Sequence, residues 1–213
     1  MVTEDLEARL QRTLEVFYRL EGVPPVEPFR VQEEFFAALG VKAGEDREAL
    51  LIHHDGECTN LALFLSRSVR AQASSFLAAL HRGEVDDLDG FCAALEGVSH
   101  FVYFTFAGGG ERPVSRLELE LQAEIDKFLL LRSVVGLDGE ELLDRLFARF
   151  RLVDGLPPDA RERYLVASSA AHRYARWAHR ALESGQGERA MADARRLYRM
   201  PAADKLSHIA KAA

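Results

Sequence analysis

The chain has 213 residues and a formal net charge of −7, with 48% hydrophobic and 29% charged residues. This length is enough to bury a hydrophobic core without disulfides, and the composition excludes a disordered or collagen-like chain. Cys58 and Cys92 do not form a CxxC pair, so both are expected to be small core residues in a reducing compartment. The N-terminus lacks the basic flank of a signal peptide, and no stretch reaches the ~18 apolar residues of a membrane span. We therefore expect a soluble cytoplasmic protein.

The charge is unevenly distributed along the chain. Residues 1–150 contain 15 lysines and arginines against 27 acidic residues, a net charge of −12, whereas residues 151–213 contain 12 against 7, a net charge of +5. We expect an acidic α+β body at 1–150 and a basic helical module at 151–213, packed on the body as one globular unit. A basic helical surface can also bind an anionic partner, which is the less favoured interpretation of the asymmetry.

The N-terminal part predicts helices followed by a hairpin. A first helix should end near Glu21, before Gly22 and the Pro24-Pro25 pair. Two apolar-rich runs in 48–65 then flank Asp55-Gly56, and this dipeptide favours the positive φ angles of a type I′ turn. The pattern predicts a β-hairpin over 48–65, with a helix over 59–70 as the competing interpretation.

Residues 98–106 read Val-Ser-His-Phe-Val-Tyr-Phe-Thr-Phe, a run rich in β-branched and aromatic side chains. Such a composition is typical of strands, so we expect a third, largely buried strand here. Helices are expected on either side of it, over about 74–80, 87–96 and everywhere after Pro113. The predicted fold is α+β and helix-dominated: a small antiparallel sheet packed with helices, followed by an all-helical C-terminal half.

The helix expected over 116–132 is apolar on two faces, which predicts a central helix between two layers. The first face is formed by Leu117, Leu121, Ile125 and Phe128, and the second by Leu119, Ala123 and Leu130. Glu118 and Glu124 fall within or beside the first face, where an ionised carboxylate must be paired, protonated or metal-bound. We expect both to be largely buried and at least one to have a specific partner, with a structural ion pair as the simplest interpretation. Glu120 should instead lie on a polar edge with Arg116 and Lys127.

His100 is a candidate ligand within the run at 98–106. If that run were helical, Glu96 and His100 would be four residues apart on one face, a spacing found in metal sites of helix bundles. Together with Glu118 or Glu124 they would form a carboxylate–histidine cluster. There is no HExxH or paired ExxH motif, so a core histidine is the simpler interpretation, and no cofactor is identified.

Other chemically suggestive residues carry little information. His53 and His54 are adjacent in a predicted strand and would point to opposite faces, so one metal could not bind both. The glycines 108–110 do not fit a phosphate-binding loop, and no nucleophile elbow is present. The sequence therefore gives no support for covalent catalysis.

A long helix over 160–184 presents arginines on one side and small residues on the other. Arg173, Arg176 and Arg180 share a face with Trp177 beside them and with His172 and His179 at its margins. Arg195, Arg196 and Arg199 cluster on the next helix. These residues can grip phosphates or an acidic protein surface. A solvated helix face, partly neutralised by Glu162, Glu183 and Asp193, is the simpler interpretation.

The favoured function is that of a non-enzymatic interaction or regulatory protein inside the cell, with its C-terminal helices as the binding surface. The expected partner is another protein or a second copy of this chain, and no membrane partner is expected. One alternative is a small metal- or ligand-binding enzyme using Glu118 or Glu124 with His100. Another is a nucleic-acid-binding module using Arg173, Arg176 and Arg180, which the net charge of −7 disfavours.

Overall fold

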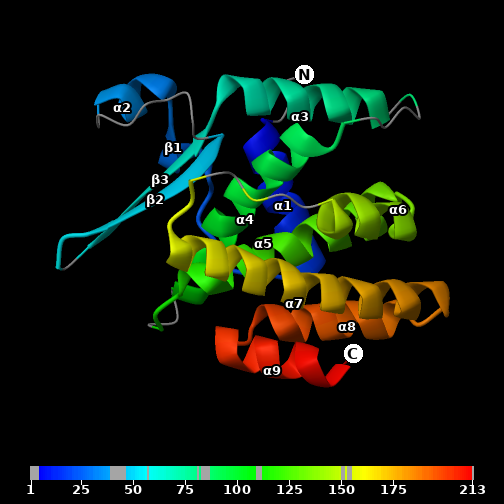
Figure 1. Cartoon of the computed structure of the whole chain (residues 1–213). Helices are drawn as coiled ribbons and strands as arrows, with labels where there is room; N and C mark the ends of the chain where they lie inside the picture. The colour runs from blue at the N-terminus through cyan, green and yellow to red at the C-terminus, as the bar shows by residue number, and fades with distance from the viewer. Residues whose placement is uncertain are drawn as a thin grey trace. The chain divides into compact units, whose positions relative to one another are not determined.

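The computed structural model describes residues 5–38, 47–56, 58–80, 82, 87–108, 112–149, 152 and 155–212. Helices predominate among them (Figure 1). By its internal contacts the chain divides into an N-terminal unit, residues 1–16 and 20–105, and a C-terminal unit, residues 17–19 and 106–213. This division follows contacts, not the charge asymmetry of the sequence, and falls near residue 105. In the described part of the chain, no helix is both long enough and apolar enough to cross a membrane.

The N-terminal unit contains a three-stranded mixed sheet in the order β1-β3-β2. Strands β2 (Glu48–His54) and β3 (Thr59–Leu65) are antiparallel, with Glu48 opposite Leu65 and His54 opposite Thr59. The short β1 (Arg30–Val31) pairs with β3 in parallel. The hairpin predicted over 48–65 is therefore confirmed, and the competing helix over 59–70 is wrong for 59–65.

The hairpin turns at Asp55-Gly56 as predicted, but the predicted type I′ turn is wrong, because Asp55 does not have the positive φ that this turn requires at both central residues. Gly56 has a φ of +97°, a conformation that glycine adopts without steric cost. The Asp55 carboxylate accepts a hydrogen bond of 2.9 Å from the backbone amide of Cys58. A local side-chain contact of this kind stabilises the turn independently of the rest of the sheet.

Four α-helices begin in the N-terminal unit: α1 (Leu6–Tyr18), α2 (Glu33–Ala38), α3 (Arg67–Leu80) and α4 (Asp89–Gly108). A buried ion pair links the first and third, because the Arg70 Nε lies 2.7 Å from a carboxylate oxygen of Glu7. The Glu7 side chain is fully buried, so this pair holds α1 and α3 at a fixed register.

The predicted strand over 98–106 is wrong, because these residues belong to α4. Val98, Phe101 and Val102 are fully buried, and so is the neighbouring Tyr103. A helix surrounded by other elements on most sides is apolar all round and shows no amphipathic period. A short apolar run of this kind cannot be assigned to a strand or a helix from its pattern alone. Here packing overrides the β-propensity of valine and phenylalanine.

Every regular element described in the C-terminal unit is a helix, as predicted. The unit contains α5 (Arg116–Leu130), α6 (Gly139–Leu143), α7 (Pro158–Glu183), α8 (Gly187–Tyr198) and α9 (Ala202–Ala212). A π-helical turn at Leu131–Val135 follows α5, and another at Asp144–Ala148 follows α6. Helix α5 is buried along almost its whole length and packs along α7, while α8 and α9 pack on α7 (Figure 1). The prediction of a central helix is confirmed.

A side chain caps the N-terminus of α5 and another caps that of α6. The Ser115 hydroxyl accepts from the backbone amide of Glu118 at 3.2 Å, at the start of α5. The Asp138 carboxylate accepts from the amide of Glu141 at 2.8 Å, at the start of α6. Each bond satisfies a backbone donor that the helix itself leaves unpaired.

Candidate functional site

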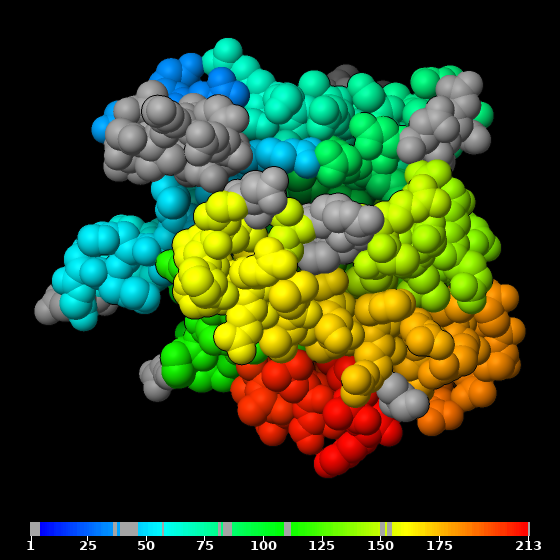
Figure 2. Space-filling view, viewed as in Figure 1, coloured from blue at the N-terminus to red at the C-terminus, as the bar shows by residue number. Residues whose placement is uncertain are grey.

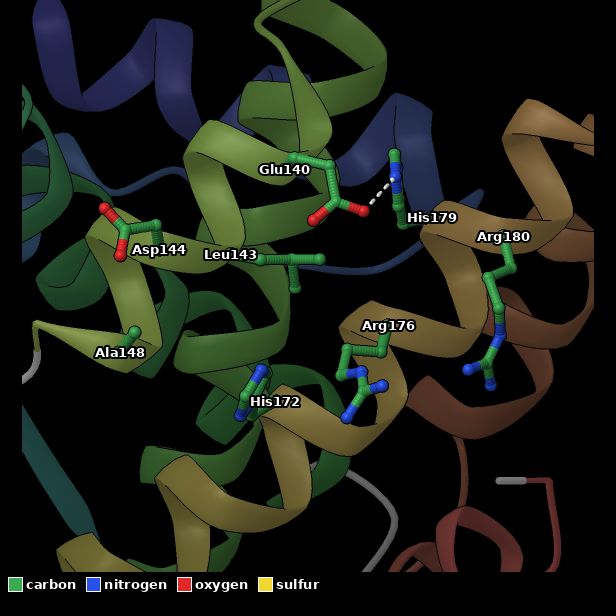
Figure 3. A pocket seen from close by; sticks show the side chains of 8 residues that line it. All are labelled: Glu140, Leu143, Asp144, Ala148, His172, Arg176, His179 and Arg180. Carbon is green, nitrogen blue, oxygen red and sulfur yellow. Dashed lines mark ion pairs between the residues drawn. The ribbon is translucent and has the colours of Figure 1, made fainter.

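An open pocket of about 350 Å³ lies between α7, α6 and the π-helical turn after α6 (Figure 3). Leu143 and Ala148 supply apolar surface to it. The other residues that line it are ionisable: Glu140, Asp144, His172, Arg176, His179 and Arg180. Two histidines and two arginines thus project from successive turns of one helix into the same pocket.

Close contact between α6 and α7 positions one of these histidines. The ring of His179 lies against Gly139, where an added Cβ atom would come within 2.2 Å of the His179 Nδ1. Only glycine leaves room for this approach. The side chain of His179 is 10% exposed, and its Nε2 lies 3.1 Å from a carboxylate oxygen of Glu140 (Figure 3). Its buried Nδ1 makes no hydrogen bond to the described residues.

Arg173, Arg176 and Arg180, hereafter the arginine face, are all exposed on α7, as predicted from the small-residue stripe on its other side. Figure 2, in which α7 is coloured yellow to orange, shows residues of this helix at the surface. Among the described residues, none forms an ion pair with any of these three guanidinium groups. The arginine face therefore carries three positive charges that the described structure does not balance.

The nearby acidic residues are paired with other groups. In the pocket, Glu140 pairs with His179, and Asp144 lies 2.5 Å from a guanidinium nitrogen of Arg149. Two of the residues expected to neutralise the face also have partners elsewhere. Glu183 pairs with Arg132 at 2.6 Å, and Asp193 lies 2.9 Å from a ring nitrogen of His208. The partial neutralisation expected from the sequence is thus not made by Glu183 or Asp193.

The positive charge in the pocket affects the pKa of His172. Its ring stacks on Phe147 with centroids 5.0 Å apart. Burial lowers the pKa of His172 below its usual value, and the positive charge of Arg176 lowers it further. The imidazole is therefore neutral at neutral pH, and a bound anion would favour its protonation.

The second arginine cluster has a different role. Arg195 donates to the carbonyl oxygen of Phe17 at 2.9 Å, and Arg199 donates to those of Tyr18 and Arg19 at 3.1 and 2.9 Å. These bonds satisfy carbonyls at the C-terminal end of α1, within the C-terminal unit. Arg196 is exposed and contacts the His208 ring at 3.1 Å. Binding of a partner by these three residues stays a prediction, and Arg195 and Arg199 have a structural use that the sequence did not reveal.

The two glutamates singled out on the central helix both have cationic partners. Glu118 is buried and receives two hydrogen bonds from the guanidinium of Arg112, at 3.1 and 2.5 Å. Glu124 has a side chain 12% exposed and lies 2.7 Å from the Lys127 ammonium. The prediction of largely buried, paired carboxylates is confirmed, and it gives both residues a structural explanation.

The prediction for Glu120 is wrong. Glu120 is 8% exposed, so it does not lie on a solvated edge. Its carboxylate lies 3.7 Å from the Nε of Arg163 in α7. Lys127, which was expected on the same solvated edge, is buried beside Glu124. The error has the same cause as the strand error: α5 is covered on more sides than its two apolar faces indicate.

Glu96 and His100 do share a face of α4, because the segment is helical. A carboxylate oxygen of Glu96 and a ring nitrogen of His100 lie within 4.8 Å of each other. A carboxylate unforeseen from the sequence lies near His100: the Oε2 of Glu48, in β2, is 4.0 Å from the Nδ1 of His100. The histidine is 8% exposed. Glu118 and Glu124, the ligands first considered with His100, have their own cations in the C-terminal unit.

Sequence reasoning missed a buried network formed by Tyr18, Gln122, Asp126 and Lys205 in the C-terminal unit. Asp126 accepts from the Tyr18 hydroxyl at 2.5 Å and from the Gln122 amide at 2.7 Å, and Lys205 donates to the Gln122 oxygen. Burial lowers the pKa of Lys205 to about 7, against the opposing effect of Glu118 and Asp126. Burial, and then the charge of Asp126, raises the pKa of Tyr18. One signal was present: Asp126 lies on the second apolar face of its helix.

Comparison of the chain with models of known families, with curated proteins and with solved structures finds no match.

Proposed function

We propose that the protein is a non-enzymatic interaction protein that binds an acidic segment of a partner protein along α7. The pocket receives one carboxylate or phosphate group of that segment. The observation that carries this proposal is the arginine face, whose three exposed guanidinium groups have no ion-pair partner among the described residues.

The chemistry of the pocket suits such a group. A guanidinium donates parallel hydrogen bonds to the two oxygens of a carboxylate or phosphate, which gives both strength and orientation. Arg176 and Arg180 are one turn apart, so both can contact one anionic group or two neighbouring groups. Leu143 and Ala148 offer apolar contact for the carbon atoms that carry the anion. Electrostatic attraction also accelerates association with an acidic partner.

Trp177 provides a direct test of this proposal, because it is the only tryptophan of the chain and lies next to Arg176. Its fluorescence can be titrated with an aspartate- and glutamate-rich peptide, with the same peptide carrying one phosphoserine, and with a neutral asparagine and glutamine version. Calorimetry supplies the affinities. We expect the acidic peptides to bind and the neutral peptide to fail.

The variants locate the binding. Arg176→Ala combined with Arg180→Ala should weaken binding about tenfold or more, since two charge-assisted contacts are lost. Arg161→Ala is the matched control: it removes the same charge from an exposed position on the same helix, about 22 Å from Arg176. It should change the affinity less than twofold.

Three results would replace the proposal. If the control weakened binding as much as the double variant, the attraction would be nonspecific. Tighter, salt-dependent binding to a DNA duplex would favour the nucleic-acid alternative. A dimer in sedimentation that the double variant dissociates would identify a second copy of the chain as the partner.

A further inference from the structure

Three nitrogen-bearing side chains of α7 line the pocket in the C-terminal unit. His172, Arg176 and Arg180 follow one another at intervals of one helical turn, so they project from the same face (Figure 3). Arg176 and Arg180 are exposed, and no described residue forms an ion pair with either guanidinium group. This side of the pocket therefore offers two permanent positive charges and one imidazole to a ligand.

The two carboxylates that line the same pocket are directed to other groups. Glu140 lies 3.1 Å from the Nε2 of His179, and Asp144 lies 2.5 Å from a guanidinium nitrogen of Arg149. Figure 3 shows the Glu140 carboxylate on the His179 side of the pocket, apart from the guanidinium groups of the arginine face. The positive charges of the arginine face are therefore available to an anion that enters the pocket.

The number of donors distinguishes between the anions that could enter. A single guanidinium that binds a carboxylate in parallel already contacts both of its oxygens and balances its one negative charge. A phosphate monoester has three terminal oxygens and a charge of about −1.5 to −2 at pH 7. Two guanidinium groups match this charge, and three oxygens can accept hydrogen bonds from both of them and from an imidazole.

The state of His172 also favours the anion of higher charge. Its ring stacks on Phe147, with centroids 5.0 Å apart, which holds the imidazole at the wall of the pocket. Burial lowers the pKa of this imidazole, and the charge of Arg176 lowers it further, so the ring is neutral at neutral pH. A dianion offsets the charge of Arg176 more than a monoanion does. It therefore favours protonation of the ring and a third charge-assisted hydrogen bond.

We propose that the pocket is selective for a phosphorylated serine or threonine, which makes the protein a phosphorylation-dependent binding module. This inference rests on the proposed function, because it specifies which group of the acidic segment the pocket receives. Arg176 and Arg180 bind the terminal oxygens of the phosphate, and His172 donates a further hydrogen bond. The pocket volume of about 350 Å³ accommodates a phosphorylated side chain, with Leu143 against the carbon atoms that carry the phosphate.

The test compares three peptides of one acidic sequence by calorimetry, with the full chain. The first has serine at its centre and the second has phosphoserine there. The third has two adjacent glutamates there, so that its charge matches that of the phosphopeptide. We expect the phosphopeptide to bind at least about tenfold more tightly than the charge-matched peptide, because only phosphate has an oxygen for each donor.

Inorganic phosphate is the probe for a free ligand in place of a modified side chain. Added at about 1 mM, it should displace little of the phosphopeptide, because it lacks the acidic residues that contact the rest of the arginine face.

Two variants locate the selectivity in the pocket. His172→Gln keeps a hydrogen-bond donor that cannot be protonated, so the preference for the phosphopeptide over the charge-matched peptide should fall at least about threefold. His53→Gln is the matched control, because His53 is an exposed histidine of β2 and does not line the pocket. Its preference should equal that of the wild type. Circular dichroism checks the fold of each variant, and Arg180→Ala, at an exposed position, is the second test if His172→Gln fails to fold.

The outcomes separate this inference from the proposed function. If the phosphopeptide and the charge-matched peptide bind equally well, the selectivity is wrong and the proposed function stands. If no peptide binds, both are wrong. Displacement of the phosphopeptide by inorganic phosphate at about 1 mM would overturn a phosphorylated side chain as the ligand. An unchanged preference in folded His172→Gln or Arg180→Ala would place the phosphate outside the pocket and overturn the inference.

Discussion

The C-terminal unit contains two groups of charged residues with opposite surroundings. In the buried network, Asp126 and Lys205 are both 0% exposed, and hydrogen bonds connect them through Gln122. On the arginine face, the three guanidinium groups are exposed and no described residue balances them. The desolvation cost of a buried charge must be offset by partners in the folded protein. An exposed charge stays hydrated, so the stability of the fold depends little on it. The comparison separates charges that specify the fold from charges that are available to a partner.

The largest effect should follow from breaking the buried network. Asp126→Ala removes the acceptor of both Tyr18 and Gln122 and the carboxylate that favours the Lys205 ammonium. We expect the free energy of unfolding to fall by about 3–5 kcal/mol, because one partner of a buried group is lost while the others stay buried. Urea denaturation measures the change. Arg176→Ala, from the arginine face, is the control and should stay within about 0.5 kcal/mol of the wild type. An equal decrease in the free energy of unfolding of the two variants would contradict the distinction between the buried network and the arginine face.

A smaller loss is expected at the ion pair of the central helix. Glu118→Gln keeps the shape of the side chain but removes the charge that receives two hydrogen bonds from Arg112. The free energy of unfolding should decrease by roughly 1–3 kcal/mol. Glu124→Gln should cost less, because the side chain of Glu124 is 12% exposed, against 3% for that of Glu118. Thermal melts distinguish this structural role from a ligand role, for which the Glu118 variant would be as stable as the wild type or more so.

The buried lysine should make stability depend on pH. The pKa of Lys205 is about 7 in the folded protein and about 10.5 when unfolded, so the unfolded chain binds more protons between these values. Stability should therefore rise with pH above 7, by about 2 kcal/mol up to pH 9. Lys205→Met should lose this rise, whereas Lys211→Met, at an exposed position of the same helix, should keep it. The measurement is urea denaturation of all three proteins at several pH values, and an unchanged rise in Lys205→Met would exclude this residue as its source.

Local signals were sufficient to predict much of the fold. The position of the turn at Asp55-Gly56 was predicted correctly, because the turn depends on contacts within a few residues. The caps at Ser115 and Asp138 depend on equally local contacts. Residues 98–106 were not, because their helix is defined by tertiary packing on several sides and not by a local period. Glu120 was misplaced for the same reason.

The candidate sites were only partly predictable. Periodicity placed the arginine face and its exposure, since it depends on one helix alone. The pairing of Glu183, Asp193 and Glu48 depends on residues distant in the chain, at Arg132, His208 and His100. A single sequence contains no signal for such pairs. Close approach of His179 to Gly139 is a similar case, because it requires the relative position of two helices.

The smallest effect should be seen at His172, where the arginine face meets the pocket. Burial lowers the pKa of this imidazole, and the positive charge of Arg176 lowers it further. An anion bound to Arg176 would offset the effect of that positive charge. The pKa of His172 should therefore increase when the acidic peptide binds, so that binding takes up protons and weakens as the pH rises through the titration of His172. Following the His172 ring proton by NMR against pH, with and without the peptide, measures the shift. The ring proton of the exposed His53 is the control, and its signal should not respond to the peptide. An unchanged His172 titration, despite measurable peptide binding, would place the bound anion outside the pocket.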